Sequence, residues 1–438
     1  MAKETADVLK KAKAARAAAL DLAMLRDAKK RAALRAMAAA LRKNRAKILK
    51  ANAIDVGAAE RQVKAGKMSK AMLKRLMVDA SKVEEMARGV ESVAKLSDPT
   101  GIVLSAMEMD RGLVLEQISC PIGVIGAIFE SRPDVVPQVS SLCLKSGNAV
   151  ILKGGSEAAN SNKILVDILT SAAESVGGFP KRAIQLIETR EEVRQVLELD
   201  EYIDLLVPRG SNDFVRFIKD NTRIPVLGHA DGICHVYIDA GADLGMAVKI
   251  ALEAKIQYPA ACNAAETLLV HEKVAASFLP AAAAEYAKHG VEMRGCPKTK
   301  KIVKGIKAAS EADWGTEYLD LVISIRVVKD IDEAIRHINK YGSKHTDTIV
   351  TSSKTAAKKF FDSVDSACVF HNASTRFSDG FRFGKGAEIG ISTNKTHARG
   401  PVGLEGLVIY KYLIKGSGQT VAEYSGPKAK KYTHKKLK

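Results

Sequence analysis

Short apolar segments alternate with helical patterns between residues 120 and 255, and this alternation constrains the fold more than any other feature of the chain. The strand-like segments span residues 122–129, 149–152, 183–187, 203–207, 224–227 and 234–238. Helical spacing of apolar side chains fills most of the intervals between them. Such alternation predicts a parallel sheet covered by helices on both faces. Parallel sheets of this kind bind ligands beyond the carboxyl ends of their strands.

The segments that follow these strands are therefore the places to look for a binding site. Lys153 ends one strand, Gly154 and Gly155 follow it, and Ser156 stands at the start of a helix. A cation, a hydroxyl and exposed amides at a helix start suit a phosphate ester, although Ser156 also suits an ordinary helix cap. Arg209 and Gly210 repeat the theme after another strand, which favours phosphate binding.

The standard nucleotide motifs are missing from the sequence. No GxGxxG follows a predicted strand and no GxxxxGK[ST] occurs anywhere in the chain. A dinucleotide could therefore be bound only in a way that departs from the common fingerprint.

Cys262 lies among small side chains, just after a helical pattern and just before an apolar run. A substrate can approach a thiol with such neighbours, whereas a free cysteine is otherwise more often part of a core. The six cysteines form no CxxC pair and no Cys/His cluster with zinc spacing, so we expect no metal site. They are typical of free thiols in a reducing compartment, which predicts a cytoplasmic protein.

The charge of the chain is concentrated at its two ends. The net charge is +18, of which residues 1–50 carry +11 and residues 426–438 carry +6, so the body is nearly balanced. We therefore expect no specific nucleic-acid binding and interpret residues 426–438 as a basic, disordered tail. No apolar stretch approaches the length of a membrane span, and the acidic residues near the N-terminus argue against a transit peptide.

Four segments resemble the aldehyde dehydrogenase superfamily, and within it the family of reductases that act on gamma-glutamyl phosphate. They span residues 120–133, 144–157, 257–269 and 372–403, and the resemblance covers essentially residues 5–425. It implies a Rossmann-like parallel-sheet cofactor domain, an α/β catalytic domain and a β-hairpin oligomerisation arm. The expected domains are residues 1–101 and 119–256 for the cofactor, 257–395 for catalysis, and 102–118 with 404–418 for the arm.

The resemblance also implies roles for individual residues. Cys262 is expected to be the catalytic thiolate, with NADP as the cofactor. The cofactor-binding positions that it implies are Lys153, Gly154, Ser156, Arg209, Gly210 and Glu317. An anionic substrate is expected to meet arginines, and the substrate-binding candidates are Arg132, Asn372, Ser374, Arg376 and Arg399.

Two departures from the superfamily pattern refine the expected reaction. Arg132 replaces the usual strand-end asparagine, and a buried arginine there could bind phosphate as well as an oxyanion. The oxyanion donors are therefore expected to be the Cys262 amide with Arg132 or Asn263. The segment 226–231 lacks the glutamate that activates hydrolytic water and contains His229. For His229 we favour a structural or cofactor-side role over that of a base that activates water, because reduction does not need one.

These departures favour reduction of glutamyl 5-phosphate to glutamate 5-semialdehyde by NADPH through a Cys262 thioester, the second step of proline synthesis. The alternative is an NAD(P)-dependent aldehyde dehydrogenase that releases a free acid. A nucleic-acid-binding protein with basic termini and an inactive relative are weaker alternatives. The expected partners are a second copy of the chain in a homo-oligomer and glutamate 5-kinase as the supplier of the substrate.

Overall fold

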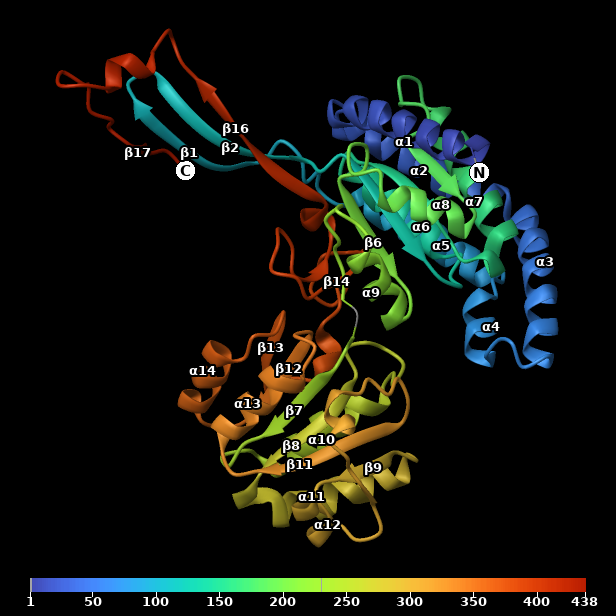
Figure 1. The fold of residues 1–438 in the computed structure, drawn as a ribbon, viewed down its shortest axis with the longest axis vertical. Coiled ribbons are helices and arrows are strands. Elements are labelled where there is room, and N and C mark those ends of the chain that lie inside the picture. The colour runs from blue at the N-terminus through green and yellow to red at the C-terminus, as the bar shows by residue number, and fades with distance from the viewer. Residues whose placement is uncertain (1, 230) are drawn as a thin grey trace.

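The computed structural model describes residues 2–229 and 231–438, which form two α/β lobes and a protruding arm (Figure 1). The first lobe is built on a four-stranded sheet and the second on a seven-stranded sheet. No helix among the described residues is long and apolar enough to cross a membrane.

A group of helices precedes the first sheet and packs against it, as the helical spacing of the first 95 residues predicts. These helices are α1 (Ala2–Ala23), α2 (Asp27–Lys43), α3 (Arg45–Lys64), α4 (Lys70–Leu76) and α5 (Ala80–Lys95). Their apolar faces join the core of the first lobe, where Leu34, Met37 and Leu41 of α2 are fully buried. Apolar burial of this kind is the main stabilising contribution to such a layer.

The first sheet is parallel and has the strand order β5-β4-β3-β6. Its strands are β3 (Val124–Phe129), β4 (Ala149–Lys153), β5 (Ile184–Ile187) and β6 (Leu205–Arg209). The helices between and after them are α6 (Val135–Lys145), η1 (Ser156–Ala158), α7 (Ala159–Glu174), α8 (Arg190–Leu197) and α9 (Asn212–Asp220). The predicted parallel sheet is confirmed, and the loops after β3, β4 and β6 meet at one edge.

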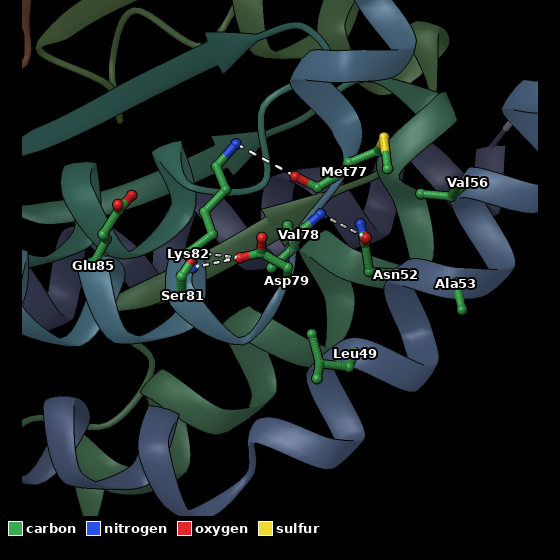
Figure 2. A pocket seen from close by; sticks show the side chains of 10 residues that line it. All are labelled: Leu49, Asn52, Ala53, Val56, Met77, Val78, Asp79, Ser81, Lys82 and Glu85. Atoms are coloured by element: carbon green, nitrogen blue, oxygen red, sulfur yellow. Dashed lines mark hydrogen bonds between the residues drawn. The ribbon is translucent and has the colours of Figure 1, made fainter.

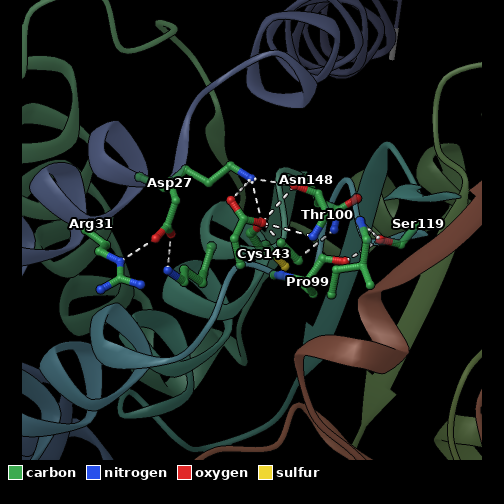
Figure 3. Close-up of polar contacts among 12 residues, drawn as sticks. Asp27, Arg31, Pro99, Thr100, Ser119, Cys143 and Asn148 are labelled. Carbon is green, nitrogen blue, oxygen red and sulfur yellow. Dashed lines mark hydrogen bonds and ion pairs between the residues drawn. The ribbon is translucent and has the colours of Figure 1, made fainter. Parts of the chain in front are cut away.

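Two fully buried lysines fix the helical layer to the rest of the first lobe, and Figure 3 labels two of their partners, Asp27 and Thr100. Lys145, at the end of α6, contacts the carboxylate of Asp27 at the start of α2. Lys30 donates to both Asp98 oxygens at 3.1 and 2.9 Å and to the Thr100 hydroxyl at 3.1 Å. Because a buried ammonium is costly without partners, these bonds hold α2 against α6 and against the segment that leads into the arm.

The second sheet is also parallel and has the order β10-β9-β11-β8-β7-β12-β13. Its strands are β7 (Cys234–Ile238), β8 (Ala265–His271), β9 (Glu292–Gly295), β10 (Lys307–Ala308), β11 (Val322–Val328), β12 (Thr346–Val350) and β13 (Cys368–His371). The helices of this lobe are α10 (Leu244–Ile256), α11 (Glu272–Lys288), α12 (Pro297–Ile302), η2 (Ala312–Gly315), α13 (Ile331–Tyr341), α14 (Lys354–Ser363) and η3 (Thr375–Phe377).

The boundary between the lobes differs from the sequence expectation, which placed residues up to 256 in the cofactor domain. β7 pairs with β8 and β12, and α10 packs in the core of the second lobe, so this lobe begins at Cys234. An apolar strand pattern shows that a strand exists but does not show which sheet it joins. The connector reaches Cys234 from Val226, which still bridges to Leu206 in the first sheet.

The arm is an antiparallel sheet of order β16-β2-β1-β17 that extends away from both lobes (Figure 1). Its strands are β1 (Val103–Asp110), β2 (Leu113–Pro121), β16 (Val408–Lys415) and β17 (Lys435–Lys436). The remaining elements are β14 (Gly390–Ser392), β15 (Gly400–Val402), η4 (Leu404–Leu407) and η5 (Val421–Tyr424).

Two expectations about the arm differ from the structure. The arm strand begins at Val408 rather than at residue 404, because Leu404 and Leu407 are buried in the core of the first lobe. The basic tail was expected to be disordered, yet Lys435 and Lys436 pair with Glu108 and Met107 of β1. Backbone hydrogen bonds of a strand do not require apolar side chains, so the lysine-rich composition concealed this pairing.

Candidate active site

The loops at the carboxyl edge of the first sheet are joined to one another by two carboxylates. The Glu130 side chain accepts the Ser211 N–H at 3.0 Å, and its own N–H donates to the Arg209 carbonyl at 3.1 Å. Glu157 accepts both the N–H and the hydroxyl of Ser131, at 2.7 and 2.5 Å. Ser131 has a φ of 39°, an unfavourable conformation that these two bonds hold in place. The post-strand loops therefore form one rigid surface.

The expected phosphate-binding residues lie on this surface. Lys153 is the last residue of β4 and is half-buried, while Ser156 is exposed at the start of η1. No side-chain hydrogen bond caps η1, so its first amides and the Ser156 hydroxyl are presented together. A Cβ at Gly154 would come within 2.0 Å of the Asn162 amide nitrogen, so this turn requires glycine. Gly210 is exposed directly after β6.

Cys262 lies in the turn between α10 and β8, and its residue is partly exposed. Two residues of the connector and β7 hold this turn from behind. A Cβ at Gly232 would lie 2.2 Å from the Cys262 carbonyl oxygen and 2.7 Å from its Cα. The Cys234 thiol donates to the same carbonyl at 3.3 Å. The position of the thiol therefore depends on a backbone contact that only glycine permits.

The backbone amides of the turn are available to a ligand. Ala264 donates to the Ala261 carbonyl within the turn, but among the described residues the N–H groups of Cys262 and Asn263 have no acceptor. Asn263 is 4% exposed, and its side-chain nitrogen donates to the Ser378 carbonyl at 2.7 Å. Two neighbouring amides beside a thiol form a surface on which an oxyanion can be stabilised.

Two histidines lie close to the thiol. One ring nitrogen of His229, one of His345 and the Cys262 sulfur all lie within 4.8 Å of one another. The two rings meet edge to face, with centroids 4.8 Å apart. Burial lowers the pKa of His229, although its hydrogen bond to the Ile391 carbonyl opposes this. The thiol therefore has imidazole neighbours from two separate segments.

Arg209 points from the first lobe toward the thiol. Its guanidinium donates to the Gln138 side chain at 3.1 Å. Burial and the nearby charge of Arg132 lower the pKa of Arg209, while Glu388 and Cys262 act in the opposite direction. The sequence assigned Arg209 to the pyrophosphate loop, and the structure also brings its charge into the electrostatic environment of Cys262.

Glu317 joins the two lobes. Its carboxylate accepts the side-chain N–H of Asn212, in α9 of the first lobe, at 3.0 Å. Burial raises the pKa of Glu317, and this hydrogen bond together with the Gly232 N–H opposes the rise. Glu317 thus lies at the boundary where a ligand held by one lobe can meet the other.

A fully buried ion pair flanks the thiol turn on both sides in sequence. Lys255 near the end of α10 donates to Glu266 near the start of β8 at 2.6 Å. Burial raises the pKa of Glu266 to about 7 and lowers the pKa of Lys255. The pair links α10 to β8, and the turn that contains Cys262 lies between these two elements.

Arg376 was expected to bind the substrate, and the structure places it near the Cys262 thiol. It is 7% exposed, donates from Nε to the Gln257 side chain at 2.8 Å, and lies over the Tyr258 ring at 5.9 Å. Burial lowers the pKa of Arg376, and the charge of Cys262 acts in the opposite direction.

The other candidates in residues 372–399 have partners within the protein. Asn372, at a φ of 55°, uses its side-chain oxygen and nitrogen on the Thr351 backbone. Ser374 caps η3, and Arg399 forms an ion pair with Asp365 at 3.2 Å. These contacts shape the loop around Arg376, and the structure records no contact between Arg399 and the thiol turn within the described residues.

Arg132 lines a cavity of about 360 Å³ between α5, α6 and the loop around residues 379–388. The sequence suggested a buried arginine here, but its side chain is 46% exposed and pairs with Asp134 at 3.0 Å. The strand ends before Arg132, so the side chain leaves the core. The cavity carries both signs of charge, from the lining residues Lys82, Glu85, Arg132, Asp134, Asp379 and Glu388.

A second cavity, of about 350 Å³, lies between α3 and the start of α5 (Figure 2). Its polar side chains serve the protein itself. Asn52 bonds to the backbone of Leu76 and Val78, and Asp79 caps α5. These roles give no indication that the cavity has a catalytic or binding function.

Sequence reasoning missed the supports of the thiol, namely Gly232, Cys234 and His345, together with Glu157. Cys234 begins a strand that has an ordinary core pattern, His345 directly precedes another strand, and Gly232 belongs to no motif. Only their positions in three dimensions connect them to Cys262, so the sequence offered no signal for them.

In this chain, one lobe has a sheet edge suited to a cofactor, and this edge faces the turn of the other lobe that contains Cys262. This arrangement is that of the aldehyde dehydrogenase class. The model of the aldehyde dehydrogenase family matches residues 1–301. A gamma-glutamyl phosphate reductase of Methanococcoides burtonii is 56% identical over 98% of this chain and 97% of its own length. One from Synechococcus is 51% identical over 98% of this chain and 94% of its own length.

The solved structures agree with this assignment. The crystal structure of the Thermotoga maritima gamma-glutamyl phosphate reductase is 44% identical, covers 94% of this chain and 99% of its own, and matches with a TM-score of 0.91. The chain belongs to the gamma-glutamyl phosphate reductases of the aldehyde dehydrogenase family, as the resemblance in its sequence predicted.

Proposed function

We propose that this chain reduces L-glutamyl 5-phosphate to L-glutamate 5-semialdehyde and phosphate with NADPH, the second step of proline biosynthesis from glutamate. The relatives at more than half identity support the substrate, and the family uses NADPH. The observation that carries the proposal is a partly exposed thiol in a turn with two available amides, in a structure whose other lobe has an uncapped helix start directly after a strand.

Cys262 acts as the nucleophile in this proposal. Its thiolate attacks the γ-carbonyl of the acyl phosphate, and the amides of Cys262 and Asn263 stabilise the oxyanion. Phosphate departs and leaves a thioester on the sulfur. When bound, NADPH supplies the hydride that reduces this thioester. The resulting hemithioacetal collapses, releases the semialdehyde and returns the sulfur.

The residues at the edge of the first sheet fit a phosphorylated dinucleotide. Lys153 supplies a cation, Ser156 a hydroxyl, and the uncapped start of η1 supplies amides, which together suit the ribose and its 2′-phosphate. Gly210 allows the backbone to approach the pyrophosphate. Glu317 is placed to orient the nicotinamide ribose between the lobes. An acidic residue at position 156 would repel the 2′-phosphate, but this position is a serine. The set therefore favours NADP over NAD.

The substrate carries an ammonium, a carboxylate and a phosphate, and the mixed-charge cavity beside Arg132 suits such a molecule. Arg376 and Arg132 are the proposed anion ligands, because a guanidinium can bind carboxylate or phosphate at two points. Asn372 and Ser374 keep the loop of Arg376 in place.

The proposal includes a cytoplasmic homo-oligomer that is assembled through the arm. It also includes glutamate 5-kinase as the partner that supplies the substrate, because an acyl phosphate hydrolyses readily in water and benefits from rapid transfer. Sedimentation of the purified chain, alone and with the kinase, tests both statements.

Phosphate-dependent reduction of NADP by glutamate semialdehyde tests the function directly. We expect activity only when phosphate or arsenate is present, and its loss in Cys262→Ser. Cys120→Ser, which changes a partly exposed thiol in the arm, is the matched control and should retain activity. Equal rates without phosphate would identify a hydrolytic aldehyde dehydrogenase instead.

A further inference from the structure

The proposed reaction needs a group that accepts the proton of the Cys262 thiol, and His229 and His345 lie beside this thiol. We propose that His229 and His345 together accept the proton of the Cys262 thiol and are catalytic residues in place of a glutamate base. This inference rests on the proposed function, and it concerns how the thiol becomes a nucleophile.

The hydrogen bond of His229 fixes its tautomer. Its Nδ1 lies 2.8 Å from the Ile391 carbonyl oxygen, which can only accept a hydrogen bond. Nδ1 therefore carries the proton, and Nε2 of the neutral ring carries a lone pair. Because Nδ1 is engaged at Ile391, Nε2 is the nitrogen that can accept a proton from the thiol.

The partners of His345 lead to the same tautomer. His345 Nδ1 lies 2.9 Å from the Thr346 hydroxyl and 3.6 Å from the Cys234 sulfur. The Cys234 thiol donates to the Cys262 carbonyl and the Thr346 hydroxyl hydrogen-bonds to Cys368, which leaves both of these partners to accept the Nδ1–H. His345 Nε2 is buried and has no hydrogen-bond partner among the described residues. A buried acceptor without a donor is costly, and the Cys262 S–H is the donor that lies nearby.

The proton balance of the reaction closes with this pair. The S–H bond breaks as the S–C bond forms, and the proton moves to an imidazole Nε2. It then passes to the departing phosphate oxygen as the C–O bond of the acyl phosphate breaks. After hydride transfer, the C–S electron pair returns to sulfur, which regains a proton from water, so that one proton is consumed per turnover.

The charges around His229 suit a transient acceptor. Glu317 favours the protonated ring, while Arg209 and Lys219 oppose it, and burial keeps its pKa below the ordinary value. Within the described residues, the titratable groups that contact His345 are the thiols of Cys234 and Cys262 and the imidazole of His229. The lowered pKa of His229 favours its neutral ring, which can take a proton.

Alkylation of Cys262 by iodoacetamide tests the proposal without any substrate. The rate is followed from pH 6 to 9 by mass spectrometry of the Cys262 peptide in the wild type, His229→Gln, His345→Gln and the control His289→Gln. His289 is an exposed histidine at the end of α11. We expect each cluster variant to react about 10-fold or more slowly at pH 7 and to approach the wild-type rate at high pH, with the control unchanged.

A second measurement separates proton transfer from structural damage. Added imidazole should restore part of the phosphate-dependent activity of His345→Ala, while KM for NADP stays near the wild-type value. Wild-type alkylation rates in both glutamine variants would overturn the proposal. Slow alkylation in those variants, combined with a wild type that fails the phosphate-dependent assay, would overturn only the proposed function.

Discussion

The two sheet edges that face each other across the site hold their functional groups by different means. At the edge of the first sheet, Glu130 and Glu157 tie loops together through backbone amides. The groups beside them are the half-buried Lys153, the exposed Ser156 hydroxyl and the first N–H groups of η1. Around Cys262 the supports are buried groups that can gain or lose a proton, such as His345, Cys234 and Glu266. The proposed function assigns cofactor binding to the first edge and the chemical steps to the second, so changes at the first should alter KM and changes at the second should alter kcat.

The strongest test of this difference is Gly232→Ala. The new Cβ would overlap the Cys262 backbone, displace the thiol by a fraction of an ångström or more, and lower kcat about 100-fold. Steady-state kinetics and circular dichroism measure the effect and confirm folding. Gly228→Ala is the control on the same connector, because its nearest contact would be an ordinary 3.6 Å. Equal kcat values for the two variants would contradict the role of Gly232.

The buried pair beneath the thiol turn predicts a stability effect. Glu266→Gln leaves the Lys255 charge buried without its partner and should lower the free energy of unfolding by about 3–5 kcal/mol. The double variant Lys255→Met, Glu266→Leu removes both charges and should lose much less. Urea unfolding at pH 8 compares them, and equal losses would show that the charges are not coupled.

The same pair gives the wild type a pH dependence. The folded-state pKa of Glu266 is raised from 4.5 to about 7, so the folded protein binds a proton more tightly than the unfolded chain between these values. The contribution of this group to stability is therefore complete below pH 4.5 and is lost as the pH rises through about 7. Urea unfolding from pH 4.5 to 7.5 should show this fall in the wild type, and its persistence in the double variant would assign it to other groups.

A smaller and purely kinetic effect is expected at the first edge. Lys153→Ala removes a charged contact to the cofactor worth ~1.5–3 kcal/mol, which weakens NADPH binding about 10- to 100-fold and leaves kcat nearly unchanged. Fluorescence titration with NADPH and with NADH measures the loss for each cofactor. Lys163→Ala, an exposed lysine on α7, is the control. A loss of kcat instead of affinity would contradict the assignment of binding to the first edge and of the chemical steps to the second.

The smallest effect on catalysis is expected from removal of residues 426–438. These residues lie on the arm, far from either edge, so kcat/KM should change by no more than ~0.5 kcal/mol in activation free energy. The deletion also exposes the β1 edge that β17 covers, which should raise self-association as measured by light scattering. A large loss of activity would assign the tail a role in the site.

The sequence predicted those parts of the molecule whose signals are local. The parallel sheet, the strands that end in Lys153 and Arg209, and the partly exposed position of Cys262 all follow from short segments that can be read one at a time. The resemblance to a known family added the arm and the position of Glu317.

The sequence could not predict features that depend on which segments meet. β7 was assigned to the wrong sheet because its apolar pattern fits either one. Arg132 was expected inside the protein because the end of β3 could not be located to the residue. His345 lies 83 positions after Cys262 in the numbering and contacts it only through the pairing of β7 with β8 and β12.

The connector between Val226 and Cys234 has a mechanical consequence. It is anchored to the first sheet at one end and enters the second sheet at the other, and it carries His229 and Gly232 between these anchors. A rotation of one lobe against the other would change the distance between the His229 imidazole and the Cys262 sulfur. With the proton transfer proposed above, such a rotation would also lower the reactivity of the thiol, so that the covalent path of the chain links the arrangement of the lobes to the nucleophile.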